Sequence, residues 1–352
     1  MTRPLRILTW NVHGGYLASL AHIGHTIYLP VRKDPRDGYG GRPHEAGLPP
    51  TLVEVPARRV PDLDLDVVLY QSPRHYLQDR HTLLGEHQRR VPAVYLEHDP
   101  PRGHPTDTRH LVQDEAVLLV HCTRFNALMW DSGRTKVRVI EHGVPVTPGV
   151  TYVGDLERAV AVINDLPTRG RRLGSDVFEA VRSSVPVDLL GLRSEPLGGL
   201  GPVAHDELPA RLARYRCYLN PIRYTSLGLA MIEAMLAGVP VVGLATTELP
   251  SVLTHGETGL LAMDPDGLAA GVRQLLDDPA LAGRIGAAGR DLARERFGVE
   301  RFARDWTAVL EEAVAIGAAE RAPRNRRRRL RALGGAATDG PLNDTAFAGR
   351  VR

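Results

Sequence analysis

The chain has 352 residues, of which 43% are hydrophobic and 24% are charged, a balance that is typical of folded globular proteins and excludes a wholly disordered chain. Its length suggests about two domains. The formal net charge is +3, but residues 317–352 contain nine arginines and three acidic residues, which leaves a net charge of −3 on residues 1–316. The basic character therefore belongs to the C-terminal segment and does not indicate a basic folded surface.

Two cysteines, Cys122 and Cys217, stand far apart and fit no metal-binding or redox spacing, so we expect two buried thiols in a reducing compartment. No basic and apolar leader opens the chain, and no stretch has the ~18 uninterrupted apolar residues of a membrane-spanning helix. The longest apolar candidate, residues 227–245, is interrupted by Glu233 and Pro240. We therefore expect a cytoplasmic protein.

Apolar runs alternate with helix-like stretches over the first part of the chain. The expected strands are residues 6–12, 26–29, 67–71, 94–98, 116–120 and 137–140, with a helix-like stretch at 81–90. Continuous apolar strands between helices are typical of a parallel sheet that is covered on both faces. The Gly- and Pro-rich residues 33–56 are expected to form a long surface excursion, either a lid or acceptor loop or a disordered insertion.

A Pro- and Gly-rich segment, residues 143–156, is the expected linker, after which the alternation restarts. The expected strands are residues 159–164, 187–190, 217–220 and 239–244, and the expected helices are residues 174–183, 207–215, 227–237, 266–277, 279–290 and 299–315. This pattern predicts a second doubly wound α/β unit.

The predicted organisation is a first domain over residues 1–146, a second domain over 147–298, a helix over 299–316 that crosses back to the first domain, and a tail over 317–352. Phe302 and Trp306 are the expected anchors of the crossing helix, at helical spacing. The arginine-rich composition of the tail predicts disorder. The tail is either solvated or in contact with anionic lipid headgroups or nucleic acid.

Residues 220–261 carry the chemistry. A strand ending at Asn220 leads through a polar loop to a helix that is expected to begin near Leu227 and Gly228. A helix N-terminus after a parallel strand favours anions, because its N–H groups are free and its dipole end is positive. Gly228 lacks a Cβ where a phosphate or sugar comes close. Glu233, among apolar neighbours in this helix, is either a buried capping carboxylate or a ligand for vicinal hydroxyls such as those of a ribose.

The run SLGLAMIEAMLAGVPVVGLA, followed by HGETGLLA, resembles the donor-binding half of the retaining glycosyltransferases of family 4, or glycosyl transferases group 1. The family pattern has two glutamates separated by seven residues and a following small-residue and Pro-Val-Val signature. Its matches here are Glu233, Ala234, Met235, Gly238, Pro240, Val241 and Val242. The resemblance covers roughly residues 94–316. It implies the α/β GT-B fold, in which two Rossmann-like, doubly wound domains face each other across a cleft.

The first glutamate of the family pair falls at Thr225. Family members commonly direct that carboxylate at the hydroxyls of the donor sugar, whereas a threonine can hydrogen-bond but carries no charge. By resemblance, the donor-binding residues of this segment are Thr225, Ser226, Leu227, Gly228, Leu229 and Glu233.

The family also carries an arginine at a strand end and a lysine that opens the next helix, and this basic pair neutralises the diphosphate. Arg172 takes the place of the lysine, with Arg171 as the near alternative. Asn164 stands at the strand end, or the role of the arginine has moved to Arg169. Arginine binds phosphate oxygens bidentately, so the replacement of lysine is chemically sound. The alternative is a solvated helix start.

In the first domain, Gly14 and Gly15 follow the first strand, where the family has a glycine loop near the acceptor and the donor phosphates. His98 stands at a strand end, where open α/β sheets bind ligands. Because family members often point a histidine from this place at the donor sugar, we predict His98 as a catalytic residue. The alternative is a loop histidine that Asp99 holds. No metal site is expected, because the spacing of His98, His104 and His110 fits no helix or strand face.

These residues predict a glycosyltransferase that moves a hexose from a UDP- or GDP-linked donor to a glycan, lipid or small-molecule acceptor. The resemblance implies retention at the anomeric carbon and no metal or other cofactor beyond the nucleotide sugar. The alternatives are a catalytically inactive GT-B relative that binds nucleotide sugar or a partner, a phosphorylase or epimerase, and a nucleic-acid binder, which the negative body of the chain disfavours. Peripheral contact of the tail with the inner face of the membrane is a further expectation.

Overall fold

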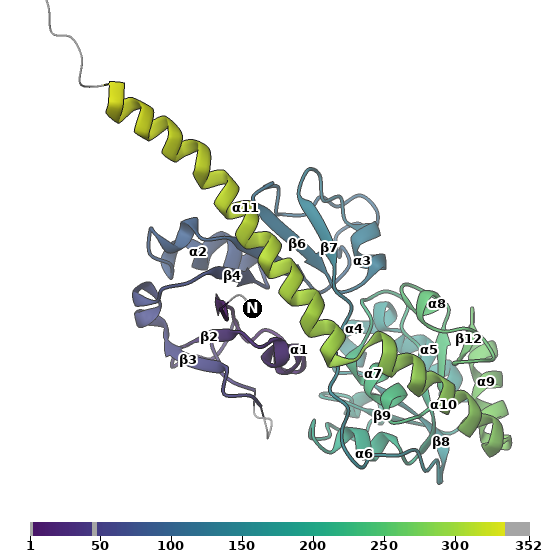
Figure 1. Cartoon of the computed structure of the whole chain (residues 1–352). Helices are drawn as coiled ribbons and strands as arrows, with labels where there is room; N and C mark the ends of the chain where they lie inside the picture. Colours follow the sequence, from purple (N-terminus) through teal and green to yellow (C-terminus); the bar gives the residue numbers. More distant parts are fainter. Residues whose placement is uncertain (1–2, 44–47, 335–352) are drawn as a thin grey trace, which may run out of the picture.

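The computed structural model describes residues 3–43 and 48–334. It contains two parallel β-sheets covered by helices, which confirms the predicted fold class. Figure 1 shows the two units side by side, the first in purple and blue and the second in green. The long helix α11 (Val299–Gly334) starts at their junction and runs along the first unit.

Within the described residues, the first sheet has seven strands in the order β3-β2-β1-β4-β5-β6-β7, and all neighbouring strands are parallel. The strands are β1 (Arg6–Leu8), β2 (Thr26–Val31), β3 (Leu52–Pro56), β4 (Val67–Tyr70), β5 (Ala93–Glu97), β6 (Val117–His121) and β7 (Lys136–Val139). The apolar runs of these strands feed two separate buried clusters, so both faces of the sheet are covered. The sheet order reverses between β1 and β4, which marks the ligand-binding crevice of a doubly wound fold.

The helical elements of the first unit are short. They are α1 (Gly14–Leu20), η1 (Ala21–Ile23), η2 (Ala57–Asp62), η3 (His75–Asp79), α2 (Arg80–Thr82), η4 (Gln88–Arg90) and α3 (Arg124–Met129). The prediction of a helix-like stretch over residues 81–90 is therefore wrong. The side chain of Gln88 accepts from the N–H of Gly85 at 2.9 Å and donates to the carbonyl of Val60 at 2.7 Å, which holds this stretch as a turn.

The surface excursion that was expected over residues 33–56 differs from the prediction at its C-terminal end. Its last residues form the edge strand β3, paired with β2 from Ile27↔Leu52 to Val31↔Pro56. An edge strand with polar residues among its apolar ones gives a weak sequence signal. Whether such a segment forms a strand depends on its packing against the one neighbouring strand.

The second sheet, as far as the chain is described, has five parallel strands in the order β12-β11-β10-β8-β9. The strands are β8 (Leu156–Val162), β9 (Val187–Leu190), β10 (Tyr215–Asn220), β11 (Val241–Leu244) and β12 (Leu260–Ala262). The helical elements are α4 (Leu166–Arg169), η5 (Gly170–Leu173), α5 (Ser175–Arg182), η6 (Glu195–Leu197), α6 (Leu208–Leu212), α7 (Leu229–Leu236), α8 (Leu249–Val252), α9 (Pro265–Asp277) and α10 (Pro279–Arg296). The order reverses between β8 and β10, which makes this the second switch point.

Helix α11 joins the second unit to the core of the first. Phe302 and Trp306 are fully buried in the cluster that covers one face of the first sheet, and the indole N–H of Trp306 donates to the hydroxyl of Tyr16 at 3.1 Å. The helix continues to Gly334, beyond the end expected at residue 316. Residues 335–352 of the predicted tail lie outside the described residues. The boundary between 146 and 147 stays a prediction and falls between β7 and β8.

Among the helices that the structure describes, none combines the length and the apolar character needed to cross a membrane.

Candidate functional site

The predicted site residues lie at the carboxyl ends of strands in both sheets. Gly14 and Gly15 follow β1, and His98 follows β5. Asn164 follows β8, and the loop at 221–228 connects β10 to α7. Both β1 and the β8–β10 pair flank the points where the strand order reverses, so the topology brings these segments to the two ligand-binding edges.

Gly15 of α1 faces helix α7 of the other unit. A Cβ at Gly15 would lie 3.1 Å from Cδ1 of Leu229 and 3.5 Å from Nε2 of His205. A larger side chain would have to displace these atoms, so the glycine permits the close approach of the two units at this edge.

A cavity of about 410 Å³ opens beside this contact. Its wall includes Asn164 and Leu192 at the strand ends of the second sheet, Glu233 of α7, and Gly15 from the opposite unit. The side-chain oxygen of Asn164 accepts a hydrogen bond from the N–H of Leu192 at 2.8 Å, which fixes the loop after β9. A mostly apolar wall with a few polar groups is typical of a pocket for a small organic ligand.

Glu233 is the acidic group of this cavity. Its residue is only 7% exposed, and its Oε1 lies 3.4 Å from Nε2 of His205. His205 is half-exposed and lies in the loop before α6, outside any recognisable motif, so sequence reasoning missed it. The burial of Glu233 at a cavity wall suits a carboxylate that accepts hydrogen bonds from a ligand.

The loop before α7 presents open space at a helix N-terminus. Helix α7 begins at Leu229, two residues later than predicted, with Gly228 as an N-cap that makes no side-chain hydrogen bond. A Cβ at Gly228 would meet nothing within 4 Å. The hydroxyl of Ser226 is buried and finds no hydrogen-bond partner in the described chain, while Leu227 packs into the core behind it. These features fit the N-terminal anion site that the sequence predicted.

Two arginines lie beside this loop. The carbonyl of Arg172 accepts from the N–H of Tyr224 at 3.0 Å, so the short helix η5 and the loop are joined. Arg169 is half-buried, and burial together with the neighbouring charge of Arg172 lowers its pKa. Neighbouring like charges are unfavourable, and an anion bound between them relieves the repulsion. Arg171, the near alternative, is instead exposed and forms an ion pair with Asp176.

His98 lines a second cavity of about 400 Å³, together with His13, Asp99 and Arg102. Its ring meets the ring of His13 edge-on, with centroids 4.4 Å apart, and that of Tyr16 at 5.1 Å. Burial, with a smaller effect of nearby histidines, lowers its pKa well below the ordinary value, so the imidazole is neutral at pH 7.

Both ring nitrogens of His98 have partners. The amide nitrogen of Gln71 donates to the carbonyl of Trp10 at 2.9 Å, which turns the amide oxygen toward Nε2 of His98, also at 2.9 Å. Nε2 therefore carries the proton, and Nδ1 faces the thiol of Cys122 at 3.9 Å. His98 is thus held in one orientation at the wall of the cavity, and its catalytic role stays a prediction.

In the described part of the chain, no group of three or more histidine, cysteine, aspartate or glutamate side chains is placed to hold a metal ion. His98 and His110 instead make separate contacts, since Nε2 of His110 lies 3.2 Å from Oε2 of Glu97.

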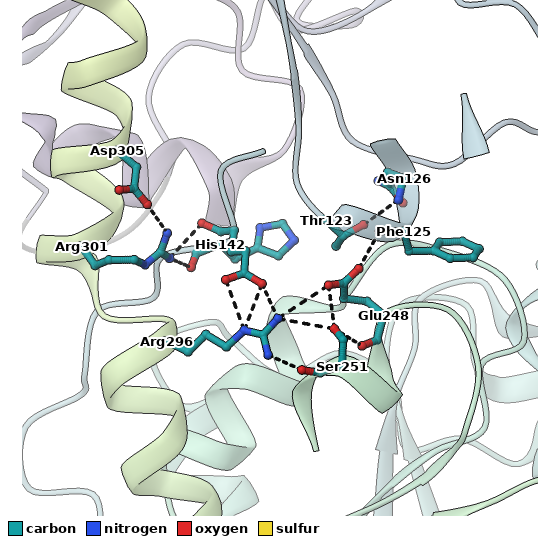
Figure 2. Close-up of polar contacts among 10 residues, drawn as sticks. Thr123, Phe125, Asn126, His142, Glu248, Ser251, Arg296, Arg301 and Asp305 are labelled. Atoms are coloured by element: carbon teal, nitrogen blue, oxygen red, sulfur yellow. Dashed lines mark hydrogen bonds and ion pairs between the residues drawn. The ribbon is translucent and has the colours of Figure 1, made fainter. Parts of the chain in front are cut away.

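A polar junction joins the two units (Figure 2). The carboxylate of Glu248, at the start of α8, accepts from the backbone N–H of Phe125 in α3 at 2.7 Å and from the hydroxyl of Ser251 at 2.8 Å. Arg296, the last residue of α10, forms an ion pair with Glu141 of the first unit at 2.5 Å. These contacts fix the orientation of the second unit against the strand ends of the first.

The sequence of the second unit matches a known family model. Residues 190–278, which run from the end of β9 through α9, match the model described as glycosyl transferases group 1. The matched segment includes the loop at 221–228, helix α7 and Glu233, which are the parts that build the anion site and the first cavity.

Relatives of known name match part of the chain. A glycogen synthase of Mycobacterium tuberculosis is 36% identical over 129 residues, which are 36% of this chain and 30% of that protein. The match thus spans under a third of the length of this curated relative.

Solved structures with the GT-B fold resemble nearly the whole chain. Sucrose-phosphate synthase from Thermosynechococcus elongatus superposes with a TM-score of 0.64 at 18% identity, covering 89% of this chain and 100% of that one. HepE from Anabaena, in complex with UDP and glucose, gives a TM-score of 0.61 at 16% identity, covering 88% and 100%. The chain therefore has the GT-B fold around its group 1 segment.

Three residues of the site carried no sequence signal of their own. His205 and Glu248 lie in loops or at short helices whose contacts come from other segments. Asp99 was expected only to hold His98, but its Oδ1 instead lies 3.5 Å from the hydroxyl of Thr225 in the group 1 segment. The contacts of Glu248 with Phe125 and of Asp99 with Thr225 join the two units, so predicting them requires knowledge of how the units dock.

Proposed function

We propose that the chain is a metal-independent glycosyltransferase that transfers a hexose from a UDP- or GDP-linked donor, with retention, to a glycan, lipid or small-molecule acceptor. The observation that carries the proposal is the loop at 221–228 in the group 1 segment. It combines an uncapped helix N-terminus, a buried unpartnered hydroxyl at Ser226 and two adjacent arginines. This combination is suited to a diphosphate.

The diphosphate is the leaving group, and negative charge grows on it as the bond to the sugar breaks. Arg169, Arg172 and the positive end of α7 are preorganised to stabilise that charge. In this account, basic side chains and the helix N-terminus take the part that a metal ion plays elsewhere, and the half-buried position of Arg169 strengthens its effect.

The nucleoside occupies the cavity of about 410 Å³ between α7 and the ends of β8 and β9. Glu233 accepts hydrogen bonds from the two ribose hydroxyls, because it is the buried carboxylate of that wall. His205 lies within 3.4 Å of the same carboxylate and holds it in position.

The hexose extends toward the second cavity, which is lined by His13, His98 and Asp99. The acceptor enters from the first unit, past the glycine pair Gly14 and Gly15. Retention is part of the proposal because the run around Glu233 resembles the retaining glycosyltransferases of family 4.

We further propose that the protein is cytoplasmic and that the basic segment after residue 317 contacts anionic membranes. The support is the net charge of +6 on residues 317–352. Each basic residue near an anionic surface contributes about 1 kcal/mol.

Incubation with a panel of UDP- and GDP-linked hexoses tests the function. The release of nucleoside diphosphate, in the presence and absence of simple sugars and lipid extracts, is followed by mass spectrometry. We expect nucleoside diphosphate to be released either from the UDP-linked or from the GDP-linked hexoses. The anomeric carbon of the transferred hexose should keep the configuration that it has in the donor. Tight binding of a nucleotide sugar with no turnover under any condition would identify a non-catalytic relative instead.

A further inference from the structure

We propose that Asp99, from the first unit, supplies the carboxylate that binds the hydroxyls of the donor hexose and so sets donor-sugar specificity. The inference rests on the proposed function. It assigns a role to the residue that stands opposite Thr225, where the second unit itself has no carboxylate.

The loop after β5 and the loop before α7 meet across the two units. Oδ1 of Asp99 lies 3.5 Å from the hydroxyl of Thr225, and the hydroxyl of Tyr224 donates to the carbonyl of Pro105 at 3.4 Å. These two contacts join residues that are 126 and 119 positions apart in the chain. The carboxylate of Asp99 therefore lies directly beside the loop that leads to the N-terminus of α7.

The backbone of Asp99 is fixed on both sides. Its N–H donates to Oε1 of Glu97 at 3.1 Å, and its carbonyl accepts from the indole N–H of Trp130 at 2.8 Å. The side chain keeps 27% of its surface exposed and lines the cavity of about 400 Å³. A rigid backbone with an accessible carboxylate is the arrangement that sugar recognition requires, because little conformational entropy is lost on binding.

The carboxylate also keeps acceptor capacity. Oδ2 binds the guanidinium of Arg102, while the contact of Oδ1 with Thr225 is long and weak. Each carboxylate oxygen accepts two hydrogen bonds, so Oδ1 can accept from hexose hydroxyls. The positive charge of Arg102 offsets the repulsion between Asp99 and a nearby diphosphate.

The other carboxylates of the two cavities are committed elsewhere. Glu97, the second acidic residue that lines the same cavity, binds the N–H of Asp99 with Oε1 and His110 with Oε2. Glu233 lies in the other cavity, beside His205. The charge of Asp99 acts on Arg169, so the carboxylate and the proposed diphosphate site are neighbours. A sugar joined to that diphosphate is thus within reach of Asp99.

The test separates binding of the sugar from binding of the nucleoside diphosphate. Asp99→Asn removes the charge with little change in shape, and Asp107→Asn, on the exposed part of the same loop, is the matched control. Dissociation constants are measured by calorimetry for UDP, GDP, UDP-glucose and GDP-mannose. We expect Asp99→Asn to weaken the preferred nucleotide sugar about ten-fold or more and to leave its nucleoside diphosphate within about two-fold. The control should change neither constant.

A carboxylate placed on the opposite loop should restore the loss. Thr225→Glu, introduced into the Asp99→Asn variant, is expected to recover at least part of the nucleotide-sugar affinity. If Asp99→Asn does not fold, as judged by circular dichroism and thermal melting, Asp99→Ser is measured against the same expectation.

Equal weakening of the nucleoside diphosphate and the nucleotide sugar, or unchanged affinity for both in a folded Asp99 variant, would overturn the inference alone. Absence of any nucleoside diphosphate binding to the unchanged protein would instead overturn the proposed function.

Discussion

The carboxylate of Glu248 in the second unit accepts a hydrogen bond of 2.7 Å from the backbone N–H of Phe125 in the first (Figure 2). Phe125 is in the first turn of α3, where backbone N–H groups have no partner within the helix. A negative charge from one unit therefore stabilises a helix N-terminus of the other. Because Glu248 is buried and also bound to Ser251, this contact holds the two units in one orientation.

Replacement of Glu248 by Gln should loosen this junction. The variant keeps the size of the side chain but removes the charge-assisted hydrogen bond to Phe125, so we expect a loss of about 1–3 kcal/mol in the free energy of unfolding. The measurement is urea denaturation followed by circular dichroism. Glu257→Gln, at an exposed position, is the control and should change stability by less than about 0.5 kcal/mol. An equally stable Glu248 variant would show that the junction does not hold the units together.

Stability should fall as the pH is lowered from about 6.5 toward 4. Burial lowers the pKa of His142 to about 4 and that of His121 to about 3, whereas both titrate near 6.5 in the unfolded chain. Between these values the unfolded chain binds more protons than the folded one, so stability is complete above about pH 6.5 and is lost as the pH falls. Each histidine accounts for about 2 kcal/mol at pH 5.

This dependence is checked by urea unfolding at pH 7.5 and pH 5. His142→Gln, which cannot titrate, should show a smaller difference between the two pH values than the unchanged protein. A stability that is constant or that rises toward pH 5 would contradict the assignment of neutral buried histidines.

Glu233→Gln should weaken binding of the nucleoside diphosphate by about 1–3 kcal/mol, because a charged acceptor for the ribose hydroxyls is lost. The loss should shrink for 2′-deoxy-UDP or 2′-deoxy-GDP, since one hydroxyl partner is already missing. Calorimetric titration of both ligands checks this prediction. Equal losses for the ribose and deoxyribose forms in a folded variant would place Glu233 away from the ribose.

Truncation after Arg321 should preserve the fold and the turnover of a soluble acceptor. The buried contacts of α11 extend to Ala313, and Gly317 still lies close to Pro92, so the removed residues follow the packed part of the helix. The truncated protein should lose binding to anionic liposomes, measured by co-sedimentation at low and high salt. If the full-length protein ignores anionic liposomes at low salt, the membrane proposal fails.

Most strands of both sheets could be predicted because buried parallel strands are continuous apolar runs, whereas the edge strands β3 and β12 were not predicted. The strand predicted at 187–190 coincides with β9. Helix α9 begins at Pro265, one residue before the helix predicted at 266–277. The stretch at 81–90 could not be assigned, because the hydrogen bonds of Gln88 to Val60 and Gly85, rather than helical propensity, decide its shape. The length of α11 was missed for a different reason, since arginine-rich composition indicates solvation but does not exclude helix.

The candidate site was predictable where it lies within one segment. The loop before α7, Gly228 and Glu233 follow from a strand–loop–helix pattern in contiguous sequence. The facing groups do not, because Asp99 and the glycine contact at Gly15 meet the second unit only after the two units dock. His205 lies within the second unit, but its contact with Glu233 depends on how the loop before α6 packs against α7. His98 was correctly placed at a strand end, but its partners Gln71 and Cys122, which occupy both ring nitrogens, come from other strands.

The central claim is that the loop before α7 and the arginines beside it bind the diphosphate of a nucleotide sugar. The most direct measurement is calorimetric titration of UDP and GDP, and of uridine and guanosine, into the unchanged protein, Arg172→Ala and Arg171→Ala. Arg171 is the matched control because it is exposed and paired with Asp176. We predict that one diphosphate binds, that Arg172→Ala weakens it about ten-fold or more while the free nucleoside is unaffected, and that Arg171→Ala changes little. No binding of either diphosphate, or equal effects on diphosphate and nucleoside, would contradict the account.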